Sequence, residues 1–128
     1  HAMAASGLLL TADEMVRFGL LLLGGGMFHG RRLVSEAFVE SATHDESGAV
    51  HDGAGDGYGY YFWIDDDLGA YRAEGRYGQF IVVLPAEGFV IVCQAFDDGD
   101  VYRLLRDELI LPLKNHLKHH AGKDGQQP

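Results

Sequence analysis

The chemistry open to this chain depends first on its possible nucleophiles. Its serines are Ser6, Ser35, Ser41 and Ser47, and its single cysteine, Cys93, lies inside a strongly apolar run. A serine hydroxyl is a weak nucleophile at neutral pH and needs an adjacent base to take its proton. No serine has a lysine three positions later, so the sequence contains no Ser-x-x-Lys motif. The chain as given therefore lacks an activated nucleophile, and Cys93 is interpreted as a small buried hydrophobe rather than a reactive thiol.

Histidines and acids form two groups with metal-ligand chemistry. They are His44, His51, Asp52 and Asp56 in one polar segment, and His116, His119 and His120 near the C-terminal end. The spacing of the second group places imidazoles on one face of a helix. However, no cysteine or closely set glutamate completes a four-ligand shell, and histidines near a helix C-terminus also interact favourably with its dipole. We therefore expect no metal and no other cofactor.

The most informative stretch is a pair of β-prone apolar runs, Gln79–Leu84 and Phe89–Phe96. Between them, Pro85 fixes its own φ and Gly88 is able to take the left-handed conformation, which predicts a β-hairpin. Two glycines, at positions 75 and 78, stand immediately before the first run. Because glycine has no side chain, another backbone or a ligand is able to approach closely at that point.

Three earlier segments precede this hairpin in a characteristic order. They are residues 6–19 (SGLLLTADEMVRFG), 24–38 (GGGMFHGRRLVSEAF) and 57–63 (GYGYYFW). Together with residues 71–85 (YRAEGRYGQFIVVLP), they resemble the C-terminal half of the class C β-lactamase-like serine hydrolases, which include penicillin-binding proteins, esterases and amide hydrolases. The resemblance runs from about residue 6 to residue 113. It implies a bacterial parent enzyme that transfers acyl groups through a serine acyl-enzyme, with its Ser-x-x-Lys and Tyr-x-Asn-type motifs upstream of this chain.

The resemblance also implies where a substrate would lie. The family carries a Lys-Thr-Gly or His-x-Gly triplet on the strand that edges the active site, and the next residue donates its backbone N–H to the oxyanion. Here Arg76 is implied to supply that N–H, and the implied substrate-binding residues are Ala73, Glu74, Gly75, Tyr77, Gly78 and Gln79. Ala73 carries no charge and donates no proton, which favours an esterase- or amidase-like parent over β-lactam or D-Ala-D-Ala recognition. The alternative is that Glu74, Arg76 and Gln79 are simply polar residues on an exposed strand end.

These residues require an α+β fold in which helices flank an antiparallel meander of about four strands. The predicted strands are Tyr58–Ile64, Ala70–Glu74, Gln79–Leu84 and Phe89–Ala95, joined by short turns. The aromatic run at 58–63 alternates as a half-buried strand does, so we interpret it as core, although one face could line a substrate cleft. The resemblance adds that this is the C-terminal part of a β-lactamase-like, serine transpeptidase-like fold.

Three helices are predicted around the sheet. The first starts at a Thr11–Glu14 capping box and is stopped by Gly24–Gly26; its expected buried residues are Met15, Phe18 and Leu22. A shorter helix runs from Ser35 as N-cap through Val39. The last is capped near Asp98 or Asp100, is expected to kink or end at Pro112, and presents Val101, Leu104, Leu105 and Leu109 at helical spacing.

Composition limits the remaining possibilities. The chain has 128 residues, which suits one hydrophobic core, and a formal net charge of −9, which argues against nucleic acid or an anionic membrane as partner. No apolar run reaches the roughly 18 residues of a membrane span. We expect residues 1–5 to be a cloning remnant or disordered, 6–113 to form a single or partial domain, and 114–128 to be a poorly ordered polar tail. The segment from Thr43 to Asp56 has the composition of a mobile loop, and the acidic clusters 65–67 and 97–100 are predicted to be solvated.

Two functions from different classes follow. The chain is either the C-terminal part of a serine hydrolase acting on a small acyl or amide substrate, or a non-catalytic module that pairs with another chain. The second possibility depends on the uncharged strand Phe89–Phe96, which the resemblance expects to pair with a strand from an upstream region. We therefore expect a homodimer, or an association with the missing N-terminal half. The resemblance is compatible with either the bacterial cytoplasm or the periplasm.

Overall fold

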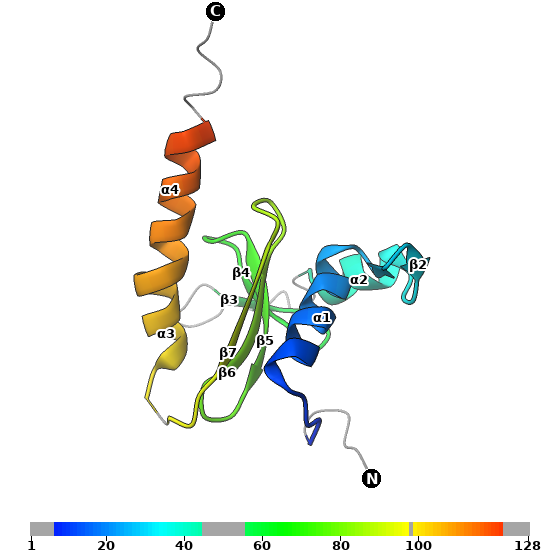
Figure 1. Cartoon of the computed structure of the whole chain (residues 1–128), viewed down its shortest axis with the longest axis horizontal. Helices are drawn as coiled ribbons and strands as arrows, with labels where there is room; N and C mark the ends of the chain where they lie inside the picture. The colour runs from blue at the N-terminus through cyan, green and yellow to red at the C-terminus, as the bar shows by residue number, and fades with distance from the viewer. Residues whose placement is uncertain (1–6, 45–55, 98, 122–128) are drawn as a thin grey trace, which may run out of the picture.

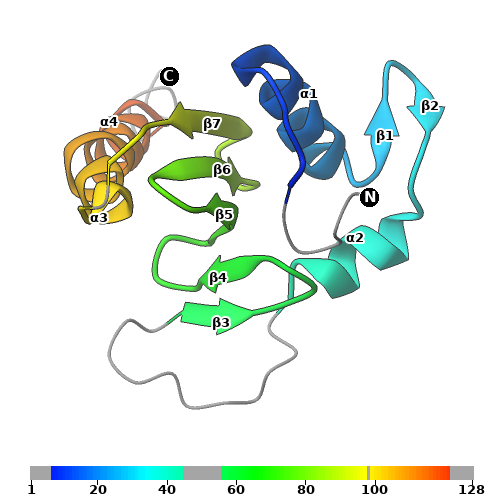
Figure 2. The same cartoon turned by 90° about the horizontal axis from the view of Figure 1, so that it is seen from below.

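The computed structural model describes residues 7–44, 56–97 and 99–121, and it is an α+β fold built around one antiparallel sheet. Helix α1 (Ala12–Leu23) packs on one face of the sheet, and α3 (Val101–Leu105), η1 (Arg106–Ile110) and α4 (Leu111–Ala121) lie on the other (Figures 1 and 2). Most of the predicted loop between Thr43 and Asp56 lies outside the described residues. None of the helices described is both long and apolar enough to cross a membrane.

Helix α1 begins at the predicted capping box. The Thr11 N–H donates to the Glu14 carboxylate at 2.7 Å, and the Glu14 N–H donates to the Thr11 hydroxyl at 3.3 Å. The Thr11 backbone N–H, and after it the Thr11 hydroxyl, which donates to the same carboxylate at 3.0 Å, lower the pKa of the Glu14 carboxyl. Met15 and Leu22 are buried as predicted, but the prediction for Phe18 was wrong, since its exposed fraction is 38%.

Gly19 takes the buried position expected for Phe18. A Cβ at this residue would lie 2.4 Å from Val90 Cγ1 on the sheet. The helix therefore approaches the sheet so closely at Gly19 that no side chain fits between them, and the turn that carries Phe18 is rotated outward.

The five-stranded sheet follows chain order, β3–β4–β5–β6–β7, which confirms the antiparallel meander. Its strands are β3 (Asp56–Tyr58), β4 (Trp63–Asp65), β5 (Ala70–Gly75), β6 (Gln79–Leu84) and β7 (Phe89–Gln94). The β6–β7 turn has the predicted form, with Gly88 at φ +73°. A separate two-stranded hairpin, β1 (Met27–Phe28) and β2 (Arg31–Arg32), was not predicted, and α2 (Glu36–Ala42) begins after the predicted N-cap Ser35 and extends beyond Val39.

The aromatic run at 58–64 forms two strands instead of the single predicted strand. Tyr58 pairs with Trp63 across a turn whose Tyr61 has φ +67°. The turn is fixed to the end of α2, because the Tyr60 N–H donates to the Ala42 carbonyl at 3.0 Å. The predicted alternation is therefore wrong, and Tyr60 and Tyr61 are exposed at the turn.

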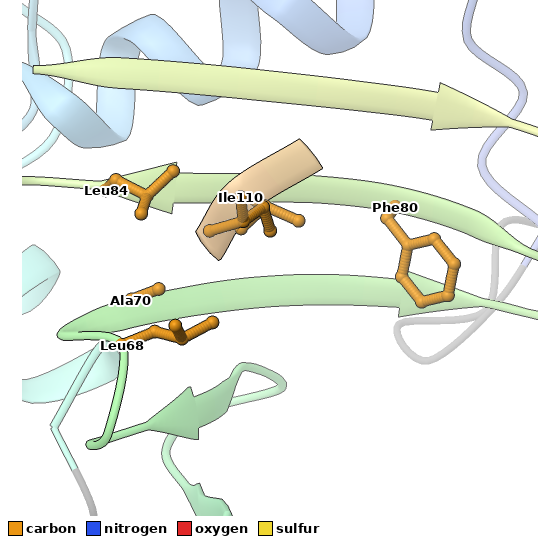
Figure 3. Close-up of a cluster of buried hydrophobic side chains, with 6 residues drawn as sticks. Leu68, Ala70, Phe80, Leu84 and Ile110 are labelled. Carbon is orange, nitrogen blue, oxygen red and sulfur yellow. The ribbon is translucent and has the colours of Figure 1, made fainter. Parts of the chain in front are cut away.

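Alternate residues of the sheet face two separate cores. Ala70, Phe80, Val82 and Leu84 face the C-terminal helix and cluster with Leu68 and Ile110 (Figure 3). On the opposite face, Tyr71 and Val83 cluster with Leu22, Val39 and Ile64. One side of β5 therefore carries the even-numbered residues toward the C-terminal helix, and the other carries odd-numbered residues toward α1.

The prediction for Pro112 was that the helix kinks or ends there; the C-terminal helix continues past this residue, so the second alternative was wrong. The preceding turn is a π-helix, in which the Leu111 N–H donates to the Arg106 carbonyl. A π-turn is wider than an α-turn, which accommodates the proline ring without breaking the helix. The wider turn also shifts the buried face by one residue: Ile110 is fully buried, whereas Leu109, predicted on the packed face, is exposed. Leu104, which precedes the π-turn, is exposed as well, so its predicted place on the packed face was also wrong. Residues 114–120 of the predicted disordered tail are helical.

Candidate functional site

The predicted oxyanion segment lies at the end of β5, where that strand loses one neighbour. Strand β4 pairs with residues 70–72 of β5, and its register stops at the Trp63–Arg72 pair. On the other side, β6 pairs with β5 as far as Gly75 and Gln79. In the part of the chain that the structure describes, residues 73–75 therefore have no strand partner on the β4 side. This arrangement leaves one strand margin accessible to a ligand.

A strained three-residue turn follows this free margin. Tyr77 has φ +68° and Gly78 has φ +81°, and a bulky residue in the left-handed region is an uncommon conformation. The turn is held by the chain after β7, because the Asp97 N–H donates to the Tyr77 carbonyl and the Ala95 N–H to the Gly78 carbonyl, each at 3.1 Å. The hydrogen bonds from Ala95 and Asp97 therefore fix the turn, while the Arg76 N–H is not used by a backbone acceptor outside the strands among the described residues.

Aromatic contacts support the same turn from outside. The Tyr77 ring lies 4.9 Å from the Phe96 ring, centroid to centroid, and the Arg76 guanidinium lies 4.7 Å from the Tyr77 ring centroid. A Cβ on Gly78 would lie 2.7 Å from Val101 Cγ2, so the turn is pressed against the start of α3. The position of Arg76 is thus set by residues that come twenty or more positions later.

Behind the segment, Glu74 takes part in a buried polar network rather than standing free. Its carboxylate accepts from Arg72 Nε at 3.0 Å, and the Arg72 side chain is only 7% exposed. The Arg72 guanidinium lies 3.8 Å from the Tyr102 ring centroid, and the Tyr102 hydroxyl donates to the Asp65 carboxylate at 3.1 Å. Asp65 is therefore buried, which corrects its predicted place in a solvated acidic cluster. The network attaches the end of β5 to the C-terminal helix.

Two cavities flank the candidate segment, one on each face of the sheet. The cavity beside the C-terminal helix has a volume of about 330 Å³ and includes Glu74, Arg76, Tyr77, Asp97, Asp100 and Tyr102. The cavity on the α1 side has a volume of about 190 Å³ and is lined by Leu8, Leu10, Met15, Ala73, Glu74, Gly75, Gln79 and Ile81. Of the seven residues predicted as a site, three line only the first cavity (Arg76, Tyr77 and Gly78), two line only the second (Ala73 and Gln79), and Glu74 and Gly75 line both.

Neither cavity beside this segment is lined by a serine or cysteine among the described residues. The Ser35 hydroxyl is the N-cap of α2 and accepts from the Phe38 N–H at 3.2 Å. Burial raises the pKa of Tyr71 to about 12, so its phenol remains protonated at neutral pH. The His116 and His120 rings are 4.4 Å apart, but the described residues contain no group of three or more metal-ligating side chains.

Sequence reasoning did not identify the residues that surround the segment. Arg72, Tyr102 and Met15 lie in different elements, and no local motif connects them. The alternation of β5 was a usable signal: it places Arg72 and Glu74 on one face and Ala73 and Gly75 on the other. Only the packing of α1 and α3 shows which residues each face meets.

Comparison with solved structures supports the fold. The chain superimposes on a structure from Bacillus anthracis assigned as a 6-aminohexanoate-dimer hydrolase, with a TM-score of 0.69 and 26% sequence identity, covering 85% of this chain. That neighbour is a β-lactamase-fold serine hydrolase, so the chain has the fold of this group of hydrolases. The chain spans 29% of the neighbour's length. No protein-family model matches the chain, and no curated protein matches it.

Proposed function

We propose that this chain is the C-terminal part of a class C β-lactamase-like serine hydrolase, and that it supplies one side of the active site and a backbone donor for the oxyanion. The observation that carries the proposal is the free margin of β5 at residues 73–75, continued by the fixed turn at Arg76. A backbone N–H aimed at a developing oxyanion contributes to catalysis without any particular side chain. The nucleophilic serine and its lysine would then come from outside this chain.

The proposed reaction is hydrolysis of an ester or an amide through an acyl-enzyme. Ala73 provides no cation for a substrate carboxylate, which supports an esterase or amidase over a β-lactamase or a penicillin-binding protein. The neighbour is named as a hydrolase of a 6-aminohexanoate dimer. Because the two units of such a dimer are joined by an amide bond, this name favours the amidase alternative.

The test uses the protein expressed with the upstream part of its reading frame. We expect a fluorophosphonate to add once, to the serine of an upstream Ser-x-x-Lys motif, and the 128-residue chain alone to show no adduct by intact mass. The substitution Arg76→Pro removes the N–H and should lower kcat about 100- to 1000-fold, whereas Arg76→Ala keeps the N–H and should stay close to wild type. An adduct on Ser35 or Ser41, or equal activity of the two variants, would contradict the proposal.

A second candidate is a non-catalytic interaction module. The supporting observation is that β7 pairs only with β6 among the described residues, so it forms an edge of the sheet. Unpaired N–H and C=O groups on an uncharged edge strand recruit other chains. On this proposal the chain forms a homodimer through β7 or binds the missing N-terminal half. Sedimentation equilibrium should show concentration-dependent association that Val92→Lys weakens; a monomer at high concentration would exclude the homodimer.

A further inference from the structure

The 190 Å³ cavity on the α1 side is an apolar groove that ends at the candidate oxyanion segment. Leu8, Leu10, Met15 and Ile81 form its apolar lining. The segment before α1, which carries Leu8 and Leu10, is anchored to the sheet, because the Gln94 side-chain amide donates to the Leu10 carbonyl at 3.0 Å. The groove is therefore built from two segments about sixty residues apart, which the tertiary structure holds together.

Ala73 keeps this groove open. Its side chain lies on the α1 face of β5, opposite Ile81 in the register. A long side chain at this position would project into the space between Met15 and Gly75. The resembled family has a lysine or a histidine at this position. Ala73 therefore both lacks that cation and leaves apolar volume beside the segment.

We propose that this groove binds an unbranched aliphatic chain on the acyl side of the substrate; this inference rests on the function proposed above. Gly75 lines the groove and immediately precedes Arg76, so a chain lying in it would present its carbonyl carbon near the Arg76 N–H. The groove has a volume of about 190 Å³, enough for a short alkyl chain. The preferred occupant is thus a short linear chain.

The opposite cavity is less suited to the same ligand. It contains Glu74, Asp97 and Asp100 in addition to Arg76, so an alkyl chain there would displace water from several charged groups. The α1-side groove has one charged residue, Glu74, whose carboxylate is already paired with Arg72. We therefore expect the alkyl chain of the substrate to lie on the α1 face of β5 and not on the face that meets the C-terminal helix.

The groove can be tested without catalysis, on the 128-residue chain itself. N-methylpropanamide, N-methylbutanamide and N-methylhexanamide, which differ only in their acyl chain, are titrated while methyl resonances are followed by NMR. Affinity should increase about fourfold for each added methylene, because each buried methylene contributes about 0.8 kcal/mol. The shifts should concentrate on Met15, Ala73 and Ile81. Equal affinity for the propanamide and the hexanamide would overturn the proposal, as would shifts centred on Val101, which lines the opposite cavity.

Two variants and one matched control define the site. Ala73→Leu fills the groove and should abolish the dependence on chain length. Leu8→Ser should weaken N-methylhexanamide binding about fourfold or more, and it carries little risk of unfolding because Leu8 is already 72% exposed. Leu9→Ser is the control, since Leu9 is 92% exposed and does not line the groove. If Leu9→Ser and Leu8→Ser have the same effect, the groove is not the binding site.

Activity of the full-length protein separates a substrate site from a surface that its own N-terminal half covers. With p-nitrophenyl esters, kcat/KM should increase from acetate to hexanoate in wild type, and this increase relative to acetate should be lost in Ala73→Leu. A flat series in an active wild-type enzyme would show that the upstream half fills the groove, and would refute this inference alone. A full-length protein that forms no acyl-enzyme would instead refute the proposed function, whatever the isolated chain binds.

Discussion

Gly78 offers a test of how the candidate turn is held. It has φ +81°, and a Cβ there would lie 2.7 Å from Val101 Cγ2 and 3.1 Å from Ala95 Cβ. Gly88, in the other hairpin, has a similar φ of +73° but no atom within 4 Å of the same position. Replacing each glycine by alanine therefore separates the cost of backbone conformation from the cost of the clash.

Both variants incur the left-handed conformation of a non-glycine residue, which costs about 1 to 2 kcal/mol. Gly78→Ala additionally forces a methyl group into packed side chains, and overpacking of this kind costs about 1 to 3 kcal/mol. We therefore expect a loss of about 2 to 5 kcal/mol in the free energy of unfolding for Gly78→Ala and about 1 to 2 kcal/mol for Gly88→Ala. Val101 belongs to the first turn of α3, so relief of the clash must displace either that helix or the turn.

Urea unfolding followed by circular dichroism, at one chain concentration, measures both values. In the full-length protein, Gly78→Ala should also lower kcat, because the displaced turn carries the Arg76 N–H, whereas Gly88→Ala should not. Equal destabilisation by the two substitutions would show that the turn is not pressed against α3. The explanation of its strained conformation would then be wrong.

Three further outcomes are expected. Burial raises the pKa of Tyr71 from 10 in the unfolded chain to about 12 in the folded protein. The stability that depends on the protonated phenol is therefore complete below pH 10, and on the order of 2 to 3 kcal/mol of it is lost as the pH increases to 12. In urea unfolding between pH 9 and 11, Tyr71→Phe should lose less stability than wild type. Lys114→Met should cost about 3 to 5 kcal/mol, since it leaves the largely buried Glu87 carboxylate unpaired, and adding Glu87→Gln should restore part of that loss. Tyr102→Phe keeps the ring on Arg72 but removes the hydrogen bond to Asp65, and should lower the free energy of unfolding by about 1.5 to 3 kcal/mol; no change would mean that this bond is not formed in solution.

Local patterns in the sequence determined those features whose cause is also local. The Thr11–Glu14 capping box, the N-cap Ser35 and the Pro85–Gly88 turn each depend on residues within four positions, and the structure confirms all three. The order of the meander was predictable because short turns leave successive strands no other neighbour. The lack of a Ser-x-x-Lys motif is likewise a property of the sequence alone.

Errors arose where a distant contact overrides the local pattern. Helical periodicity placed Phe18 in the core, but the close approach of Gly19 to Val90 turned it outward. Alternation of aromatic residues predicted one strand at 58–64, but the bond from the Tyr60 N–H to the Ala42 carbonyl stabilises a turn there. Helical spacing also failed beyond Leu105, because a single π-turn shifts every later side chain by one position.

Only the tertiary structure decided what the candidate segment faces. The sequence places residues 73–79 at a strand end followed by a turn, but it does not show that β4 stops at Arg72 and leaves the margin of β5 free. Nor does it show that Ala73 faces Met15 and Leu10 while Glu74 is paired with Arg72 on the opposite side. These relations join residues up to about sixty-five positions apart, and they are fixed by the packing of two helices on opposite faces of one sheet, which no local pattern encodes.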